Sequence, residues 1–295
     1  MQVLQTQGLS KQYGSIRAVD QLNLEISAGS IYGILGPNGS GKTTTLGMVL
    51  GITQPTAGTY HWFDGQTGAA ARQRIGALLE TPNFFPYLNA DDNLAIVAHI
   101  KKSKNEDYTR LLDLVGLTAR RKSPFSTFSL GMKQRLAIAS ALIGDPDVLI
   151  FDEPTNGLDP QGIVEVRNTL LTIAQSGKTI IMASHILVEV EKICSHVAIL
   201  KSGQLLASGT VGSILSNDQT IEVASDNLGD LAVKLQSLPA INSMTRQENW
   251  LELSVNEDFS AAELNQWAFH NQITLHHLVA RRRSLESEFL EITSK

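Results

Sequence analysis

The chain has 295 residues, of which 42% are hydrophobic and 18% are charged. This composition is typical of a folded globular protein and excludes a disordered one, and the length suits one large domain with a smaller one. The net charge of −5 argues against a protein dedicated to binding nucleic acid, since such proteins usually carry a basic surface. It leaves nucleotides open as ligands, because a phosphate site needs only local donors.

The first elements along the chain predict an antiparallel sheet and then a buried strand. Apolar residues alternate with polar ones at Leu22, Leu24 and Ile26, which is typical of a strand with one buried face. The continuous apolar run over 31–35 predicts a short buried strand, and the segment 43–50 predicts a helix. A glycine-rich loop joins the two.

The middle of the chain predicts further helices and strands in alternation. Helical spacing with charged faces extends from about 81 to 142 and predicts a helical subdomain. Buried strands are predicted at 148–151 and 179–183, with a helix near 162–175 between them. Strands that alternate with helices in this way indicate a parallel α/β core.

The remainder of the chain predicts a hairpin and then a separate small domain. The hairpin covers 197–207, with Ser202 and Gly203 at its turn. Beyond about residue 215, strands are predicted at 220–224, 242–246, 250–255 and 274–280, and helices near 228–238 and 260–270. This strand–helix–strand–strand–helix–strand order favours a small α+β domain of the ferredoxin-like kind.

The segment 36–43, GPNGSGKT, fits the phosphate-binding loop pattern G-x-x-x-x-G-K-[ST] at every fixed position. Its glycines let backbone N–H groups face phosphate oxygens, Lys42 brings positive charge to the β- and γ-phosphates, and the Thr43 hydroxyl suits Mg²⁺. A glycine-rich turn without function is the alternative, but the strand before the loop and the helix after it favour a nucleotide site. The residues expected around the phosphates are Gly36, Pro37, Asn38, Gly39, Ser40, Gly41, Lys42, Thr43 and Thr44.

Two carboxylates follow the predicted strand 148–151. Asp152 and Glu153 would emerge at the carboxyl end of a buried strand, where α/β sheets bind ligands. Asp152 is expected to hold Mg²⁺, directly or through water, and Glu153 to polarise the water that attacks the γ-phosphate. An acidic pair after a strand often only meets solvent, and the phosphate-binding loop is what favours the functional interpretation here.

These two motifs, together with a third at 128–132, resemble those of the ATP-binding cassette (ABC) ATPases. The family's signature sequence is LSGGQ, and this chain has FSLGM followed by KQR. Three of the five positions differ, but Ser129 and Gly131 are kept, and the resemblance implies that they contact the γ-phosphate of an ATP bound to a second copy. The resemblance extends from residue 1 to about 212.

Three further positions match motifs of that family. The segment 156–159, NGLD, resembles the D-loop and implies that Asp159 lies near the nucleotide. His185, just after the predicted strand 179–183, matches the switch histidine beside the γ-phosphate. Tyr13 stands where family members stack an aromatic ring on adenine, although ordinary packing in a strand is the alternative there.

Glu80 is the most informative departure from the family pattern. Members usually have glutamine here, in the segment that links the nucleotide to the membrane subunit, and glutamate resembles the subgroup that exports bacitracin or lantibiotics. A carboxylate keeps an oxygen for Mg²⁺ or water and adds negative charge near ATP, and tolerated drift is the alternative. The aromatic residues Phe84, Phe85 and Tyr87 suit either the core of the helical subdomain or a contact with a membrane partner.

The resemblance implies a P-loop NTPase of the α/β class. An ABC cassette is expected over 1–214, with its helical subdomain at about 81–142, and a small α+β accessory domain over 215–295. ATP and Mg²⁺ are the expected ligands, and the partners are a second copy of the chain and integral membrane permease subunits, with no nucleic acid. The expected function is ATP-driven export, with peptide antibiotics or drugs as candidate substrates. A soluble ABC ATPase outside transport, and a regulatory module that does not hydrolyse ATP, are the competing interpretations.

The cytoplasmic face of the membrane is the expected location. The first residues lack the basic and then apolar plan of a signal peptide, and no apolar run approaches the ~20 residues that a spanning helix needs. The single cysteine, Cys194, cannot form a disulfide within the chain and favours a reducing compartment. A membrane role would therefore depend on partner subunits.

Overall fold

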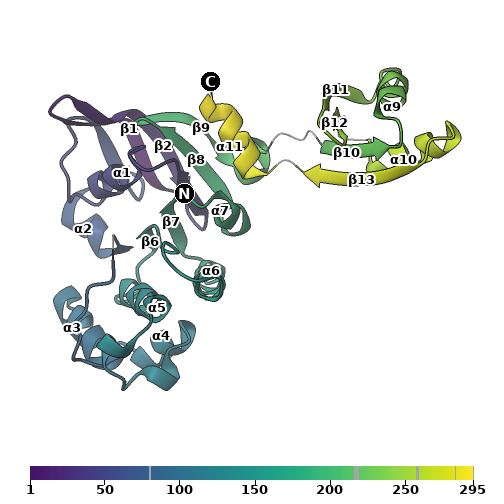
Figure 1. Ribbon diagram of the computed structural model, residues 1–295. Helices are drawn as coiled ribbons and strands as arrows, with labels where there is room; N and C mark the ends of the chain where they lie inside the picture. The colour runs from purple at the N-terminus through teal and green to yellow at the C-terminus, as the bar shows by residue number, and fades with distance from the viewer. Residues whose placement is uncertain (80, 216–218, 257–258, 283, 295) are drawn as a thin grey trace. The chain divides into compact units, whose positions relative to one another are not determined.

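The computed structural model describes residues 1–79, 81–215, 219–256, 259–282 and 284–294. Contacts between residues divide the chain into two compact units, whose elements are labelled in Figure 1. The first unit comprises Met1–Val211 and Ile292–Lys295, and the second comprises Gly212–Glu291. The sequence predicts a second domain that runs to residue 295, whereas the structure groups the last four residues with the first unit.

One part of the first unit is an antiparallel sheet with the strand order β2-β1-β4. Its strands are β1 (Gln2–Tyr13), β2 (Ile16–Ser27) and β4 (Ala57–Trp62). Leu22, Leu24 and Ile26 of β2 are all buried, which confirms the alternation predicted for this strand. The indole N–H of Trp62 donates a 2.8 Å hydrogen bond to the carbonyl oxygen of Val49. This bond ties the sheet to the end of α1 (Lys42–Val49).

The core of the first unit is a six-stranded sheet with the order β5-β6-β7-β3-β8-β9. Its strands are β3 (Ile31–Leu35), β5 (Ile75–Leu78), β6 (Val148–Asp152), β7 (Thr179–Ser184), β8 (His196–Lys201) and β9 (Gln204–Thr210). All neighbours are parallel except β9, which runs antiparallel to β8. Every residue of β3, β6 and β7 is buried, as expected for parallel strands that are covered on both faces.

The strand order brings three distant chain segments together. β6, β7 and β3 are neighbours that run in the same direction, so their carboxyl ends meet at one edge of the sheet. The glycine-rich loop follows β3, Asp152 ends β6, and His185 follows the last residue of β7. The predicted motifs therefore converge at the edge where α/β sheets bind ligands.

Helices flank the sheet and build a separate helical subdomain (Figure 1). Besides α1, the helices that connect the strands are α2 (Gly68–Gln73), α6 (Pro160–Gln175), α7 (Leu187–Ile193) and α8 (Val211–Ile214). The subdomain contains α3 (Ala90–Lys101), α4 (Tyr108–Leu114), α5 (Leu130–Ala141) and 3₁₀ turns at Thr118–Arg120 and Phe125–Thr127. Arg121 donates to both carboxylate oxygens of Asp91, at 2.9 and 3.0 Å. This bidentate pair holds the start of α3 against the loop that follows α4.

The second unit has the element order that the sequence predicts. Its elements are β10 (Gln219–Ser225), α9 (Leu228–Leu235), β11 (Ile241–Arg246), β12 (Leu251–Val255), α10 (Ala261–His270) and β13 (Leu275–Arg282), and α11 (Leu285–Ser294) follows. The sheet is antiparallel with the order β11-β12-β10-β13. Because β12 lies between β10 and β11, the unit has the split βαβ arrangement of ferredoxin-like domains. Its core joins Ile221, Val223 and Leu253 of the sheet to Leu231 and Leu264 of the helices.

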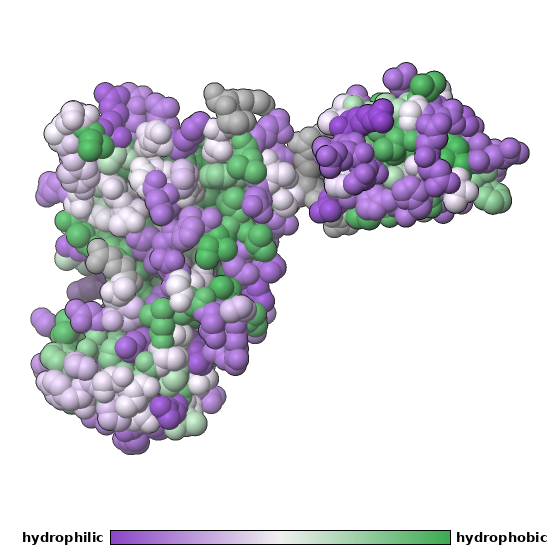
Figure 2. Space-filling view, in the orientation of Figure 1, coloured by the Kyte–Doolittle hydropathy of each residue, from purple (hydrophilic) through white to green (hydrophobic). Residues whose placement is uncertain are grey.

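The surface of each unit is mixed in character. On the face seen in Figure 2, hydrophobic residues form small patches among hydrophilic ones on the first unit, and hydrophilic residues predominate on the second. None of the helices within the described residues is both long and apolar enough to cross a membrane. The exposed aromatic residues of the first unit include Tyr13, Phe85 and Tyr87. All three belong to segments that the sequence associates with a ligand or a partner.

Candidate functional site

The glycine-rich loop joins β3 to α1 in a conformation that its glycines allow. Gly39 and Gly41 have φ angles of 80° and 105°, in the left-handed region that residues with a Cβ rarely adopt. Gly41 also precedes the first turn of α1, and no described side chain caps that turn. The first N–H groups of the helix therefore remain available for an anion in front of the loop.

Lys42 brings a buried positive charge to this loop. Its side chain is 6% exposed, and its Nζ lies 3.5 Å from Oε1 of Glu153. The ammonium group also donates hydrogen bonds to the carbonyl oxygens of Gly36 and Pro37, at 2.8 and 3.2 Å. A buried charge needs such partners, and they hold the ammonium group beside the space that a phosphate would fill.

Glu153 is held by its backbone as well as by its side chain. Its N–H donates to the carbonyl oxygen of Ala183 in β7 at 3.0 Å. Its Oε2 lies 2.8 Å from Nδ1 of His185 and accepts a bond from the His185 backbone N–H at 3.3 Å. The φ angle of Glu153 is 50°, a left-handed conformation that is uncommon for residues other than glycine and occurs often at functional sites.

The result is a carboxylate fixed between a cation and an imidazole. Lys42 contacts one oxygen of Glu153, and His185 contacts the other. The side chains of Glu153 and His185 are 20% and 39% exposed, so water reaches both. An anchored carboxylate that is open to water suits a general base. Asp152, the residue before it, is buried.

An open pocket of about 580 Å³ lies in front of these groups, a volume that suits a nucleotide. The predicted residues that line it are Tyr13, Asn38, Gly39, Gly41, Lys42, Thr43, Thr44 and Glu153. Tyr13 is half exposed, so part of its ring is available to an adenine base. The structure thus brings the loop, the Glu153 carboxylate and the Tyr13 ring together around one space.

Three predicted residues lie apart from the described lining of this pocket. Ser129, Gly131 and Asp159 occupy the starts of α5 and α6 instead. The Ser129 hydroxyl accepts a bond from the Met132 N–H at 3.3 Å, and the Asp159 carboxylate accepts one from the Gly162 N–H at 3.1 Å. A Cβ at Gly131 would lie 3.7 Å from Cα of Gly162, so the two helix starts are adjacent.

The remaining predicted residues support the loop or lie outside the described part of the chain. Gly36 and Pro37 supply carbonyl groups to the lysine, and Ser40 is a buried residue of the loop itself. Asp152 ends β6 at 6% exposure. Glu80 lies outside the described residues.

Sequence reasoning missed several residues that line the same pocket as the loop. Residues 16–18, at the start of β2, and Ser202, in the turn between β8 and β9, line the pocket. The N–H of Gly203 donates to the carbonyl oxygen of Ser40 at 3.0 Å, and its own carbonyl oxygen accepts from the Asp20 N–H at 2.8 Å. The sequence predicts the turn, but no local signal connects it to a loop so far away along the chain.

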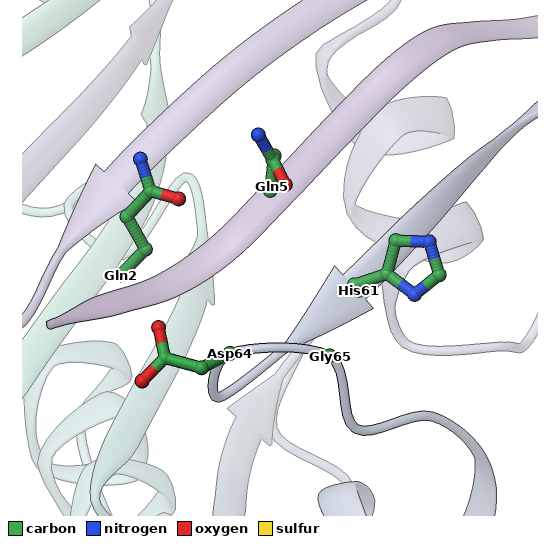
Figure 3. A pocket seen from close by; sticks show the side chains of 5 residues that line it. All are labelled: Gln2, Gln5, His61, Asp64 and Gly65. Carbon is green, nitrogen blue, oxygen red and sulfur yellow. The ribbon is translucent and has the colours of Figure 1, made fainter.

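A second hollow of about 400 Å³ lies on the antiparallel sheet (Figure 3). Gln2, Gln5, His61, Asp64 and Gly65 line it. The side chains of His61 and Asp64 point away from each other in Figure 3. Nowhere in the described ranges do three or more His, Cys, Asp or Glu residues gather into a possible metal site. We assign no function to this hollow.

A phosphate-binding loop between a buried strand and a helix, with an anchored carboxylate at the end of a nearby parallel strand, is the arrangement of P-loop nucleotide hydrolases. The model of the ABC transporter family matches residues 19–156. That range includes the loop and Glu153, although it ends before His185.

Curated relatives extend the likeness over the whole chain. A bacitracin transport ATP-binding protein of Enterococcus faecalis is 33% identical over 98% of this chain and 96% of its own length. A bacitracin transport ATP-binding protein of Bacillus licheniformis is 44% identical over 69% of this chain and 68% of its own. A linearmycin resistance ATP-binding protein of Bacillus subtilis (strain 168) is 32% identical over 99% of both chains.

A solved structure of the ATP-binding subunit of an ABC transporter matches with a TM-score of 0.64 and 29% identity, over 72% of this chain and 91% of its own. The chain therefore belongs to the ABC transporter family, as an ATP-binding subunit that hydrolyses ATP. The cassette fold predicted from the sequence is confirmed.

We expect Glu153→Gln to lower phosphate release by at least about 100-fold, because an amide cannot take a proton from the attacking water. ATP binding should persist, since the change removes no contact to a phosphate. The matched control is Glu25→Gln on the exposed side of β2. Phosphate release and equilibrium ATP binding are measured on both variants, and near-wild-type release by Glu153→Gln would remove this residue from its role.

Proposed function

We propose that the chain powers the export of peptide antibiotics or similar drugs through separate membrane-spanning subunits. The observation that carries this proposal is the likeness to a bacitracin transport ATP-binding protein over 98% of the chain, the second unit included. The linearmycin resistance relative, which matches over 99% of this chain, supports a role in resistance to such a compound. Position 80 is glutamate where family members usually have glutamine, as in the peptide-export subgroup, and this resemblance supports the proposal.

We propose that two copies of the chain form the hydrolytic unit. The starts of α5 and α6, which carry Ser129, Gly131 and Asp159, lie next to each other and are not part of the described lining of the chain's own pocket. Leu130 and Val164 beside them are 44% and 41% exposed, which suits an apolar contact. A second copy placed against this surface would receive the Ser129 hydroxyl and the N-terminus of α5 at its own ATP.

Magnesium fits the oxygen atoms that the site offers. Thr43 lines the pocket, and Asp152 ends the neighbouring strand β6. Mg²⁺ commonly takes only one or two protein ligands and completes its shell with phosphates and water. We propose that Thr43 and Asp152, with Glu80 directly or through water, hold the ion, which would neutralise charge on the phosphates.

In the mechanism that we propose, each residue has a separate task. The backbone N–H groups of the loop and the Lys42 ammonium group bind the β- and γ-phosphates and offset their charge. Tyr13 orients the adenine base. Glu153 accepts a proton from the water that attacks the γ-phosphate, and His185 keeps the carboxylate pointed at that water.

The aromatic residues after Glu80 divide between the core and a partner surface. The ring of Phe84 packs edge-on against Phe125, with 5.2 Å between ring centres. Phe85 and Tyr87 are 48% and 72% exposed and contact each other, with 6.1 Å between ring centres. We propose that this exposed pair meets the membrane permease and holds the chain at the cytoplasmic face of the membrane.

We expect Ser129→Arg to block hydrolysis in the dimer while ATP affinity at low protein concentration stays near wild type, because the arginine would clash only in the partner's site. Mixing this variant with Lys42→Ala chains should restore no more than one working site per dimer. The control is Ser237→Arg, an exposed serine of the second unit. Normal hydrolysis by Ser129→Arg over a range of protein concentrations would contradict the shared site.

The double substitution Phe85→Ser and Tyr87→Ser should separate hydrolysis from export. We expect the isolated subunit to keep its ATPase activity within about twofold, since surface changes away from a site are usually neutral. Protection against bacitracin by the complete transporter should fall. The control is Phe269→Ser, another aromatic residue at 80% exposure.

The docking role of Phe85 and Tyr87 and the export proposal are contradicted by different results. Full protection by the double variant would contradict the docking role of Phe85 and Tyr87. If cells that contain the wild-type chain and its membrane subunits gain no protection from bacitracin or linearmycin, the export proposal fails, whatever the variants do.

A further inference from the structure

The end of β8 and the turn that follows it contact the phosphate-binding loop at two points. A Cβ at Gly36 would overlap the carbonyl oxygen of Leu200, so the end of β8 is in direct contact with the start of the loop. The Gly203 N–H donates to the carbonyl oxygen of Ser40 at 3.0 Å. Two points of the loop thus take their position from residues 200–203.

The hydrogen bond from Gly203 is important because Ser40 makes few other hydrogen bonds among the described residues. Its side chain is buried, and its hydroxyl oxygen has no hydrogen-bond partner among the described residues. Its N–H donates to the carbonyl oxygen of Pro37 at 3.1 Å, a bond within the loop itself. The bond from Gly203 therefore connects the loop to the rest of the unit at this point.

The turn cannot move independently of its surroundings. Gly203 has a φ angle of 82°, and a Cβ there would lie 2.8 Å from the carbonyl oxygen of Ala18. Its carbonyl oxygen accepts from the Asp20 N–H, and Gln204 donates to the Asp20 carboxylate at 3.1 Å. Because close-packed interiors transmit strain, a displacement of the end of β8 would act on this turn, on its contacts with residues 18–20 and on the loop bonded to it.

Lys201 is the last residue of β8 and directly precedes this turn. Its ammonium group donates a hydrogen bond to the backbone carbonyl oxygen of Thr293, in the last turn of α11. The final carbonyl groups of a helix have no partner within the helix and carry partial negative charge, so a lysine there is a favourable cap. Both residues belong to the first unit.

We propose that Lys201 is a positioning residue for ATP binding. By holding the carbonyl oxygen at the end of α11, it fixes the β8–β9 turn, and the turn fixes Ser40 in the phosphate-binding loop. The last residues of the chain thereby raise the affinity of the cassette for ATP. This inference concerns the ATP site alone and stands whether or not the chain serves peptide export.

The test compares ATP binding and turnover of the wild-type chain with those of four variants and of one combination of two of them. Lys201→Met removes the charge and keeps the length of the side chain, and Lys201→Arg restores a donor to the same carbonyl oxygen. A chain that ends at Glu291 removes the carbonyl oxygen instead. Lys234→Met is the matched control, because this lysine forms an i,i+4 ion pair with Asp230 in the second unit, at 3.3 Å.

We expect Lys201→Met to weaken ATP binding and raise KM about fivefold, with kcat at saturating ATP close to wild type. Lys201→Arg should regain most of the affinity. The shortened chain should lose affinity to the same extent, and combining it with Lys201→Met should add no further loss, since both changes break one interaction.

Three results would overturn the proposal. One is an ATP affinity of Lys201→Met equal to that of Lys234→Met. Another is a combined loss that equals the sum of the two separate losses. The third is an equal fall in kcat and affinity, which would indicate general destabilisation. If Lys201→Met does not fold, the ATP affinity of the shortened chain, which lacks the bond, is compared with that of Lys201→Arg, which keeps it.

Discussion

The carboxylate of Glu153 lies between the Lys42 ammonium group and the His185 imidazole, and the first unit is arranged so that these three groups meet. These contacts require that three chain segments meet at one edge of a sheet. The parallel neighbours β6, β7 and β3 bring the segments there, because their carboxyl ends lie at the same edge. Complete burial of these strands fixes the edge. The left-handed backbone at Glu153 is unfavourable in itself, by about 1–3 kcal/mol, and the bond to the Ala183 carbonyl oxygen helps to offset it.

In the dimer that we propose, one chain offers only part of the reaction site. Its pocket combines the phosphate-binding loop with the Glu153 carboxylate and the Tyr13 ring, whereas Ser129 and Asp159 cap helices outside the described lining of that pocket. A cap of this kind keeps the first N–H groups of α5 in order, so the surface is prepared before any nucleotide reaches it. Closure around ATP would then depend on the approach of two prepared surfaces, and loss of the γ-phosphate would release them.

Local signals predict most of the fold and most of the residues described as lining the pocket. The phosphate-binding loop is readable from sequence because Gly39 and Gly41 are needed for its backbone, and β3 and β6 are readable because parallel strands are apolar throughout. Contacts between distant segments could not be read, and the bond from Gly203 to the loop is the clearest case. The same is true of the second unit. The alternation of strand and helix patterns predicts the order of its elements, but the position of β12 between β10 and β11 depends on packing between distant segments. Whether Phe84 and Tyr87 face the core or solvent was open for the same reason.

Phosphate release by the purified chain and by its Lys42→Ala variant, in the presence of Mg²⁺ and ATP, tests the central claim most directly. Lys42 is the buried cation of the loop and a neighbour of Glu153, so its loss should weaken ATP binding and leave the base without a substrate. The account predicts steady phosphate release by the wild-type chain and at least about 100-fold less by Lys42→Ala, with unchanged folding. Equal release by the two proteins would contradict the assignment of this pocket as the ATP-hydrolysing site.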